Sequence, residues 1–434
     1  MSGSPENFGR NPAKPFLARK ARNKTLELRV FAVFFHPSRR FTGLGGAEKR
    51  FLNVLKRWVD EYGVLVTVVE PGPGLVRSQR NCKALKLDSF FPFRASGFLG
   101  LYFEWVLWMV QACFACASIV KRGNYNVVLA ANNTVPNLAV AYFVHLVSHK
   151  PLCVVVHHLD VQDARVAVTS GKVYRTYRNA GYSRFLALLK AAAFRTIVFF
   201  LKRSDMCIAV SRFTAETLTK NGVSASKIFV SGNGTSFEKL GGRTAELKEY
   251  DAVFVGRISR EKGVFDLVKI WRKLADRNLG FRLIIIGSGP DLRELRSHVK
   301  RAGLERLVTV KGACSDGEMY SLVKASKVFL FPSRFEGWGL AVGEALACGL
   351  PVLCYKIPAL EEVFGECPAV VFTKLADWKA LAEKLTELLV SGGWRQLSSQ
   401  ASTYSRRFTW RKVAEKDLEF VRLAAAKRGF RVDV

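Results

Sequence analysis

The chain has 434 residues, a net charge of +31, 49% hydrophobic residues and a mean hydropathy of +0.09. This length exceeds what one hydrophobic core usually serves, so it predicts two or three domains, and the apolar content excludes a mostly disordered chain. The charge is uneven, because residues 1–250 hold 36 Lys and Arg against 15 Asp and Glu, and the rest hold 31 against 21. The first half therefore meets an anionic partner or carries a solvated basic surface.

In chain order, residues 1–25 form a basic tail that is too poor in apolar side chains to fold. Residues 26–35 predict a buried strand, a glycine-containing loop follows, and residues 47–59 have apolar positions at helical spacing. Further strands are predicted at 64–70, 125–131, 152–159 and 206–211. Because helical stretches separate these strands, the segment 26–240 predicts a first domain with a parallel, doubly wound sheet.

Two segments of this first domain raise the question of a membrane. Residues 96–120 are long enough to span a bilayer and carry Glu104 as their one charge, which favours a packed or surface-dipping helix over a transmembrane span. Residues 182–203 predict a helix with Arg184, Arg195 and Lys202 on one face, opposite a broad apolar face. Such a helix either lies in an anionic interface or packs its apolar face on the sheet.

The nine cysteines lie mainly in apolar segments, and no secretory signal precedes them, so free thiols in a reducing cytosol are expected. Cys113 and Cys116 form one CxxC pair without a second pair, which favours helix packing over a zinc site.

After a polar connector at 238–251 the alternation of strands and helices restarts, which predicts a second α/β domain at 241–408. Its strands are expected at 252–259, 281–290, 307–312, 327–334, 350–355 and 369–374. Helices at 393–407 and 410–427 follow, and the segment 409–434 is expected to cross back and pack on the first domain.

Three turns in the second domain could hold a ligand. In "VFVGRISREKGVF" a strand ends at Gly256, and Arg257 and Lys262 precede a helix, so that a diphosphate would meet two cations and a helix N-terminus. The turn "IIIGSGP" places Gly287 and Gly289 where backbone can approach a ligand closely. Neither pattern is a Walker A loop or a dinucleotide-binding fingerprint.

The third turn interrupts the apolar stretch 331–354 with two glutamates eight positions apart. Glu336 belongs to the loop at the carboxyl end of a strand, and Glu344 lies about one turn into the following helix. Between them the turn Gly337-Trp338-Gly339 lets backbone N–H groups point outward before the helix begins near Leu340. In a doubly wound sheet the carboxyl ends of the strands form the binding crevice, so both carboxylates can accept hydrogen bonds from sugar or ribose hydroxyls.

Together these motifs resemble those of the retaining glycosyltransferase family 4, the "group 1" family with the GT-B fold. "FEGWGLAVGEALACGLPV" resembles its E-x7-E signature, "GRISREKG" its G-R-x4-K-G donor loop, "IIIGSGP" its G-x-G-P turn and "GLGGAEKRFLNVL" its N-terminal glycine loop. The resemblance covers residues 28 to 425. It implies two Rossmann-like domains that face each other across a cleft, and transfer from a nucleotide sugar with retention of configuration.

The resemblance also implies roles for matching residues. Arg257 and Lys262 would hold the diphosphate, Glu336 the donor sugar and Glu344 the ribose. The backbone of Gly45 and Gly46 would approach the diphosphate from the first domain. His157 would stand where the family often has His-Asp, although His158 follows it here and leaves open which histidine faces the donor.

No cofactor and no metal are expected, because no Asp-x-Asp occurs and Ser315 with Glu318 is better explained as a capping box. Fixed cations and helix N-termini would stabilise the departing diphosphate instead. UDP- or GDP-sugars are the expected donors.

The acceptor side of such an enzyme would be the first domain, where the excess charge and both apolar helices lie. A lipid-linked acceptor at an anionic, cytoplasmic membrane face is expected, with a peripheral enzyme, and a soluble glycan or sugar phosphate is the alternative. A non-catalytic protein that binds membrane or nucleic acid is a more distant alternative; no nucleic-acid motif occurs, and it leaves the two glutamates unexplained. A phosphorylase or a sugar-nucleotide epimerase would share the architecture.

Overall fold

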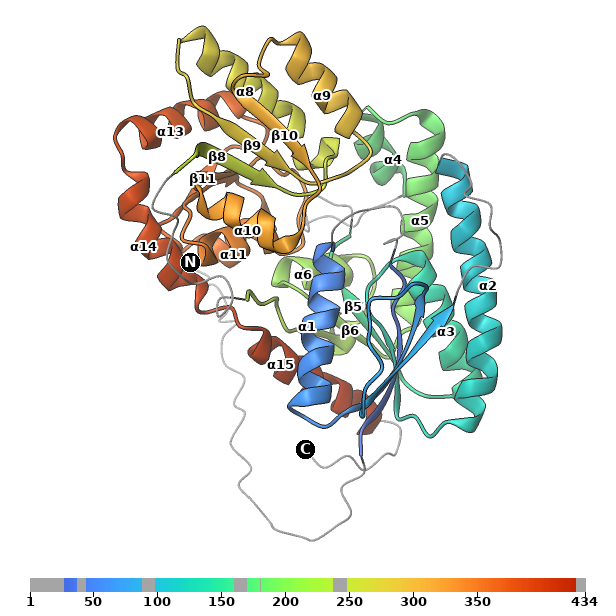
Figure 1. Ribbon diagram of the computed structural model, residues 1–434. Coiled ribbons are helices and arrows are strands. Elements are labelled where there is room, and N and C mark those ends of the chain that lie inside the picture. The colour runs from blue at the N-terminus through green and yellow to red at the C-terminus, as the bar shows by residue number, and fades with distance from the viewer. Residues whose placement is uncertain are drawn as a thin grey trace, which may run out of the picture.

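The computed structural model describes residues 27–36, 44–87, 98–159, 170–179, 181–236 and 248–426 (Figure 1). The tail expected at 1–25 and most of the connector expected at 238–251 lie outside the described residues.

The first domain is built on a seven-stranded parallel sheet with the order β3-β2-β1-β4-β5-β6-β7. Its strands are β1 (Arg29–Val33), β2 (Leu65–Pro71), β3 (Cys82–Leu87), β4 (Val127–Ala130), β5 (Leu152–Val156), β6 (Met206–Ala209) and β7 (Ile228–Val230). The edge strands β3 and β7 were not among the strands expected from the sequence. β3 exposes a lysine on each of its faces, Lys83 and Lys86, and β7 has three residues, so neither shows a continuous apolar run.

Helices cover both faces of this sheet. They are α1 (Gly46–Asp60), α2 (Phe98–Arg122), α3 (Val135–Ser148), α4 (Ser170–Asn179), α5 (Arg184–Arg203) and α6 (Arg212–Lys220), with a short turn η1 (Ala225–Lys227) before β7. One apolar layer joins the sheet to α2, α3 and α5, and the other joins it to α1 and to the last helix of the chain. All nine cysteines are free, and Cys116 packs in the first of these layers, as expected for helix packing.

The helix α2 packs against α3 and the strands β2 and β3, yet it is apolar on both sides. Its buried stripe contains Trp108, Ala112 and Cys116. A second stripe points outward and is 49% to 78% exposed: Phe103, Val106, Val110 and Phe114. Among the described helices, the segment Phe103–Arg122 is the one that is long and apolar enough to cross a membrane, by length and composition only.

The helix α5 differs from its expected arrangement. Its buried face consists of Ala187, Ala191, Phe194 and Leu201. Arg184, Arg195 and Lys202 are exposed, as expected, but so are the large apolar side chains of Phe185, Leu188 and Phe199. The expectation that cations and apolar residues lie on opposite faces is therefore wrong, because small alanines form much of the contact with the domain and leave larger side chains outside.

The second domain contains a six-stranded parallel sheet with the order β10-β9-β8-β11-β12-β13. Its strands are β8 (Tyr250–Val255), β9 (Leu283–Ile286), β10 (Val308–Gly312), β11 (Ser326–Phe331), β12 (Val352–Tyr355) and β13 (Val370–Thr373). Its helices are η2 (Arg260–Lys262), α8 (Val264–Asp276), α9 (Leu292–Arg301), α10 (Asp316–Lys324), α11 (Leu340–Ala347), α12 (Pro358–Phe364), α13 (Trp378–Val390) and α14 (Trp394–Ser405). The expected fold of two doubly wound domains is confirmed.

The chain crosses between the domains twice, and the two crossing segments lie together. Thr235 and Thr409 form an isolated parallel bridge, and the amide of Thr235 donates to the carbonyl of Phe408 at 2.9 Å. The helix α15 (Trp410–Ala426) then returns to the first domain and packs along α1 (Figure 1). A buried ion pair between Arg50 and Asp417, 2.8 Å apart, joins the two helices.

Candidate active site

The loops at the carboxyl ends of the two sheets meet at the interface between the domains, and glycines permit the closest approach. A Cβ atom on Gly337, after β11, would lie 1.6 Å from the carbonyl oxygen of His157, after β5. A Cβ atom on Gly46, at the start of α1, would lie 2.9 Å from the Cδ1 atom of Leu340, at the start of α11. These contacts bring the sequence-predicted residues of both domains together at this interface, which we call the cleft.

The loop between β8 and α8 places Lys262 beside Glu336. The Nζ atom of Lys262 donates to the Oε1 atom of Glu336 at 2.5 Å, and both side chains are largely buried. Gly263 has a φ of +71°, and its missing side chain lets the loop approach the carbonyl oxygen of Pro332. Arg257, in the same loop, is exposed. Lys262, one of the two expected phosphate ligands, is thus paired with Glu336, the expected sugar ligand.

The turn after β9 supports this loop from the side. A Cβ atom would lie 1.9 Å from the carbonyl oxygen of Gly256 if placed on Gly287, and 2.2 Å from that of Ile258 if placed on Gly289. The amide of Ile258 also donates to the carbonyl of Ser288 at 2.9 Å. Both glycines therefore allow close backbone packing between neighbouring loops, and a ligand contact from them stays a prediction.

The turn between the two glutamates is fixed by an aromatic cluster. The side chain of Trp338 is 4% exposed and packs edge-to-face on Phe364 and Phe408, with ring centroids 5.2 and 5.1 Å away. Gly339 has a φ of +92° and caps α11. The buried indole of Trp338 therefore holds the turn in place. A ligand could contact this residue only through its backbone.

Glu344 is bound by two groups that the sequence analysis did not identify. The Nζ atom of Lys49, on α1 of the first domain, lies 3.0 and 3.3 Å from the two carboxylate oxygens, and the hydroxyl of Tyr320 donates to Oε1 at 3.0 Å. Burial and the neighbouring carboxylate raise the pKa of Tyr320. One signal for Lys49 was present in the sequence, because a lysine in the first turn of a helix opposes the helix dipole.

His157 lies at the end of β5, where the first domain meets the turn at Gly337. Its amide donates to the Oδ1 atom of Asn133 at 3.1 Å, and its Nε2 atom is buried without a hydrogen-bond partner in the described part of the chain. Burial, reinforced by the charge of Arg50, lowers the pKa of His157 well below its ordinary value, so the ring is neutral. His158 is exposed, and the open choice between the two histidines stays open.

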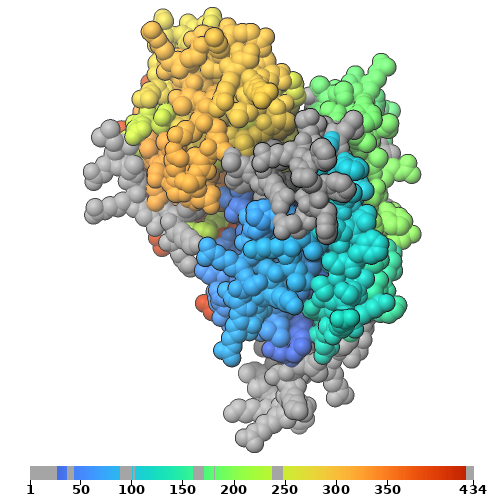
Figure 2. Space-filling model, turned by 45° about the vertical axis from the view of Figure 1, so that its right-hand side comes forward, coloured from blue at the N-terminus to red at the C-terminus, as the bar shows by residue number. Residues whose placement is uncertain are grey.

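A second contact between the domains borders the donor loop. The hydroxyl of Tyr182, at the start of α5, donates to the Oε2 atom of Glu261 at 2.9 Å. Burial, with the nearby carboxylate of Glu261, raises the pKa of Tyr182. Glu261 directly precedes Lys262, so the outer helices of the first domain touch the loop that carries the expected phosphate-binding lysine. In Figure 2 the surface of α4 and α5 rises beside that of the second domain.

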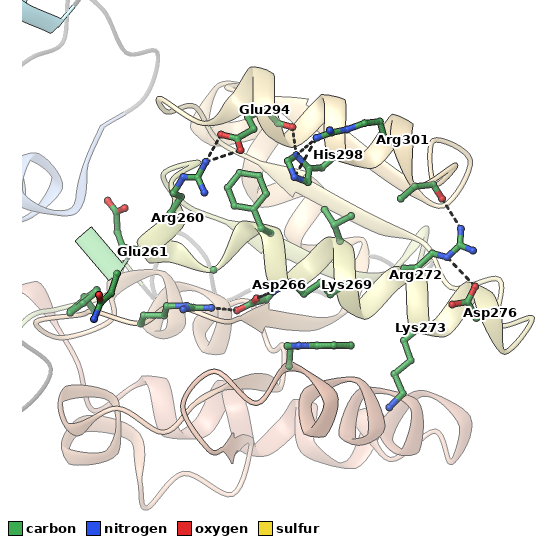
Figure 3. Close-up of a pocket in the computed structure, with 18 of the residues that line it drawn as sticks. Arg260, Glu261, Asp266, Lys269, Arg272, Lys273, Asp276, Glu294, His298 and Arg301 are labelled. Atoms are coloured by element: carbon green, nitrogen blue, oxygen red, sulfur yellow. Dashed lines mark hydrogen bonds and ion pairs between the residues drawn. The ribbon is translucent and has the colours of Figure 1, made fainter. Parts of the chain in front are cut away.

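The structure also has a cavity beside α8. A groove of about 1120 Å³ runs along α8, and neither Glu336 nor Glu344 lines it (Figure 3). Its charged side chains pair with one another, as Arg260 does with Glu294 and Arg272 with Asp276. Because the two glutamates lie outside this groove, the candidate site is the cleft between the domains.

Comparisons with known proteins bear on this cleft. A family model described as "Glycosyltransferase Family 4" matches residues 44–239, and one described as "Glycosyl transferases group 1" matches residues 237–408. Among solved structures, HepE from Anabaena in complex with UDP and glucose superposes with a TM-score of 0.67, covering 91% of this chain and 99% of that one at 17% identity. A likeness at this identity shows a shared fold.

Two curated relatives match part of the chain. The O-antigen chain mannosyltransferase B of Escherichia coli is 25% identical over 175 residues, which are 40% of this chain and 45% of the relative. The GDP-mannose:cellobiosyl-diphosphopolyprenol alpha-mannosyltransferase of Xanthomonas campestris is 27% identical over 201 residues, which are 45% of this chain and 53% of the relative. The chain therefore spans about half the length of these relatives.

Proposed function

The chain belongs to the group 1 glycosyltransferases, and on that premise we propose that it is an enzyme that transfers a sugar from a nucleoside-diphosphate sugar to an acceptor, with retention and without a metal. The observation that carries the proposal is the pairing of Lys262 with Glu336 and of Lys49 with Glu344 at one cleft. Two carboxylates that accept from hydroxyls, set beside two ammonium groups, match the hydroxyls and the diphosphate of such a donor.

The proposed chemistry follows from the charges at the cleft. Cleavage of the bond between the anomeric carbon and the phosphate oxygen leaves positive charge on the sugar ring and negative charge on the nucleoside diphosphate. Arg257, Lys262 and the N-terminus of α11 would stabilise the departing diphosphate, and Glu336 would hold the sugar. Because these side chains supply positive charge themselves, we propose that no metal is needed.

The donor is tested by the release of nucleoside diphosphate. Purified protein is incubated with UDP-, GDP- and ADP-sugars in EDTA, with and without a membrane lipid extract, and the anomeric configuration of the product is read by NMR. Release from one donor that rises with lipid supports the proposal, and loss of activity in EDTA that Mg²⁺ restores would contradict metal independence. Release that depends on inorganic phosphate would indicate a phosphorylase, and donor isomerisation without transfer would indicate an epimerase.

For the acceptor we propose a lipid-linked substrate at the cytoplasmic face of a membrane, where the enzyme binds peripherally. The name of the Xanthomonas relative states a diphosphopolyprenol acceptor. In this chain the support is the membrane-facing surface, which we define as the exposed apolar side chains Phe103, Val106, Val110, Phe114, Phe185, Leu188 and Phe199 with the cations of α4 and α5.

The charge of this surface suits an anionic leaflet. The helices α4 and α5 carry eight Lys and Arg and no Asp or Glu, and the helix α3 lies between α5 and α2. Exposed apolar side chains beside cations are typical of helices that lie in an anionic interface. The test is co-sedimentation with vesicles: binding to vesicles that contain phosphatidylglycerol but not to pure phosphatidylcholine supports the proposal, and transfer to soluble glycans at an undiminished rate without lipid would favour the soluble acceptor.

A further inference from the structure

Lys49 lies at the contact between the two domains. It belongs to the first turn of α1, and its side chain is 15% exposed. The ammonium group contacts both oxygens of Glu344 and lies 3.4 Å from the hydroxyl of Tyr320. A buried cation in this position is unfavourable both to solvation and to the helix dipole, so its ion pair must compensate for both.

The geometry of the pair leaves room for a donor. Oε1 of Glu344 accepts from Lys49 at 3.0 Å and from Tyr320 at 3.0 Å, whereas Oε2 has the longer contact of 3.3 Å. An ionised carboxylate has about four acceptor positions, so hydroxyls can bind at Oε2 without displacing the lysine. Lys49 can therefore stay at the site when a ribose occupies Glu344.

The surroundings of the pair favour a negative ligand. The first turn of α11, which begins beside α1, contains no acidic residue, and its N-terminal N–H groups carry partial positive charge. The carboxylate of Glu48 lies against Gly45 and offsets the N-terminal charge of α1 itself. Lys49 is then a cation through which the first domain can reach the ligand on α11.

We propose that Lys49 is a phosphate ligand of the donor, supplied by the first domain. The inference rests on the proposed function, because it takes a ribose at Glu344 as given. In a nucleoside diphosphate the 5′ carbon of the ribose carries the first phosphate, and the 3′ hydroxyl is the ribose hydroxyl nearer to it. An ammonium group on the 3′ side of the ribose carboxylate can therefore reach that phosphate. The same residue would hold Glu344 in place and join the two domains around the diphosphate.

The test is calorimetric titration of the full chain with a nucleoside diphosphate and with the corresponding nucleoside. For Lys49→Met, we expect the dissociation constant of the diphosphate to rise about 10- to 100-fold, as for loss of a charge-assisted hydrogen bond. The constant for the nucleoside should change less than threefold, and Lys49→Arg should restore most of the diphosphate affinity. In donor kinetics, KM should rise in Lys49→Met and kcat should fall with it.

The control is Lys56→Met, because Lys56 is an exposed lysine on the same helix; it should bind both ligands as the wild type does, and thermal melts check that all variants are folded. Diphosphate binding that is unchanged or tighter in Lys49→Met would overturn the proposal, because the lysine would then only compete with the donor for Glu344. Equal losses for nucleoside and diphosphate would overturn it too and would indicate a structural role. If the wild type binds no nucleoside diphosphate at all, the proposed function itself fails.

Discussion

The groove along α8 and the proposed membrane-facing surface are both rich in cations, but they differ in the carboxylates that accompany those cations. In the groove, Asp266 is 2% exposed and accepts from Lys269 at 3.1 Å, from Arg334 at 2.7 Å and from Tyr355 at 3.0 Å. The sequences of α4 and α5 contain eight Lys and Arg and no Asp or Glu. Paired charge fixes local structure, whereas an excess of positive charge beside exposed apolar side chains can attract an anionic partner. The cleft lies between these cases, since its lysines are paired with carboxylates that a ligand can use.

The largest effect is expected at the cleft. The double variant Glu336→Gln/Glu344→Gln should lose at least about 1,000-fold in kcat/KM, because groups that contact charge or hydroxyls in the transition state each contribute about 10²-fold or more. Glu336→Gln alone should bind nucleoside diphosphate better than Lys262→Ala does. The check is steady-state kinetics of diphosphate release.

The matched control is Glu361→Gln, which breaks an exposed ion pair with Lys356 in the same domain. It should keep full activity, since exposed pairs contribute little. Comparable activity of the wild type and the double glutamate variant would show that the cleft pairs resemble those of the groove and serve structure only.

The second effect is on stability, which a substitution in the groove should lower more than one on the proposed membrane-facing surface. Asp266→Asn removes the buried charge that Arg334, Lys269 and Tyr355 contact and should lower the free energy of unfolding by about 2 kcal/mol, as for the loss of hydrogen bonds to a charged group. Arg195→Gln, on the exposed face of α5, should change it by less than about 0.5 kcal/mol. Urea denaturation measures both, and a similar loss in the two variants would remove the distinction.

The third effect concerns binding to vesicles. Arg184→Gln/Arg195→Gln/Lys202→Gln should weaken binding to vesicles with anionic lipid about 100-fold, since each cation near such a surface contributes about 1 kcal/mol. The difference should shrink in 0.5 M salt, because salt screens charges at this range. As a control, Arg272→Gln removes a cation that is paired with Asp276 in the second domain and should leave vesicle binding unchanged.

The smallest effect is a pH dependence of stability. The pKa of His157 is lowered in the folded protein, so below about pH 6.5 the unfolded chain takes up a proton at this ring that the folded chain does not. Above this pH the ring therefore costs no stability. As the pH is lowered from 6.5 to 5.5, His157 should lower the free energy of unfolding by about 1 kcal/mol. His157→Asn should abolish that part of the fall, as measured by urea denaturation at both pH values.

The sequence predicted the local parts of the site and missed the parts that join distant segments. Lys262 and Glu336 stand out because each follows a clear strand and lies in a glycine-bracketed loop. Lys49 and Glu344 are 295 positions apart, and Tyr182 and Glu261 are 79 apart, so no local pattern links them. Which domain surfaces meet depends on the crossing segments, and these carry no periodic signal.

The same limit explains the orientation of the outer helices. Helical spacing predicted α2 and α5, but both carry large apolar residues on more than one side, so periodicity could not decide which face packs on the sheet. Trp338 is a related case, because a turn that binds a ligand and a turn that is anchored by a buried indole look alike in sequence. In both cases the packing between elements decides which side chains are buried, and the local sequence does not.

The return of α15 to the first domain has a consequence for biosynthesis. On the ribosome, the segments up to β7 emerge first, yet the faces of α1 and the sheet that α15 covers stay open until the whole second domain has been made. The ring nitrogen of Trp58, which donates to the carbonyl of Ala414 at 2.9 Å, finds its acceptor only then. The first domain is thus completed last, and the nascent chain must be kept from aggregating through that exposed face while the second domain folds on its own.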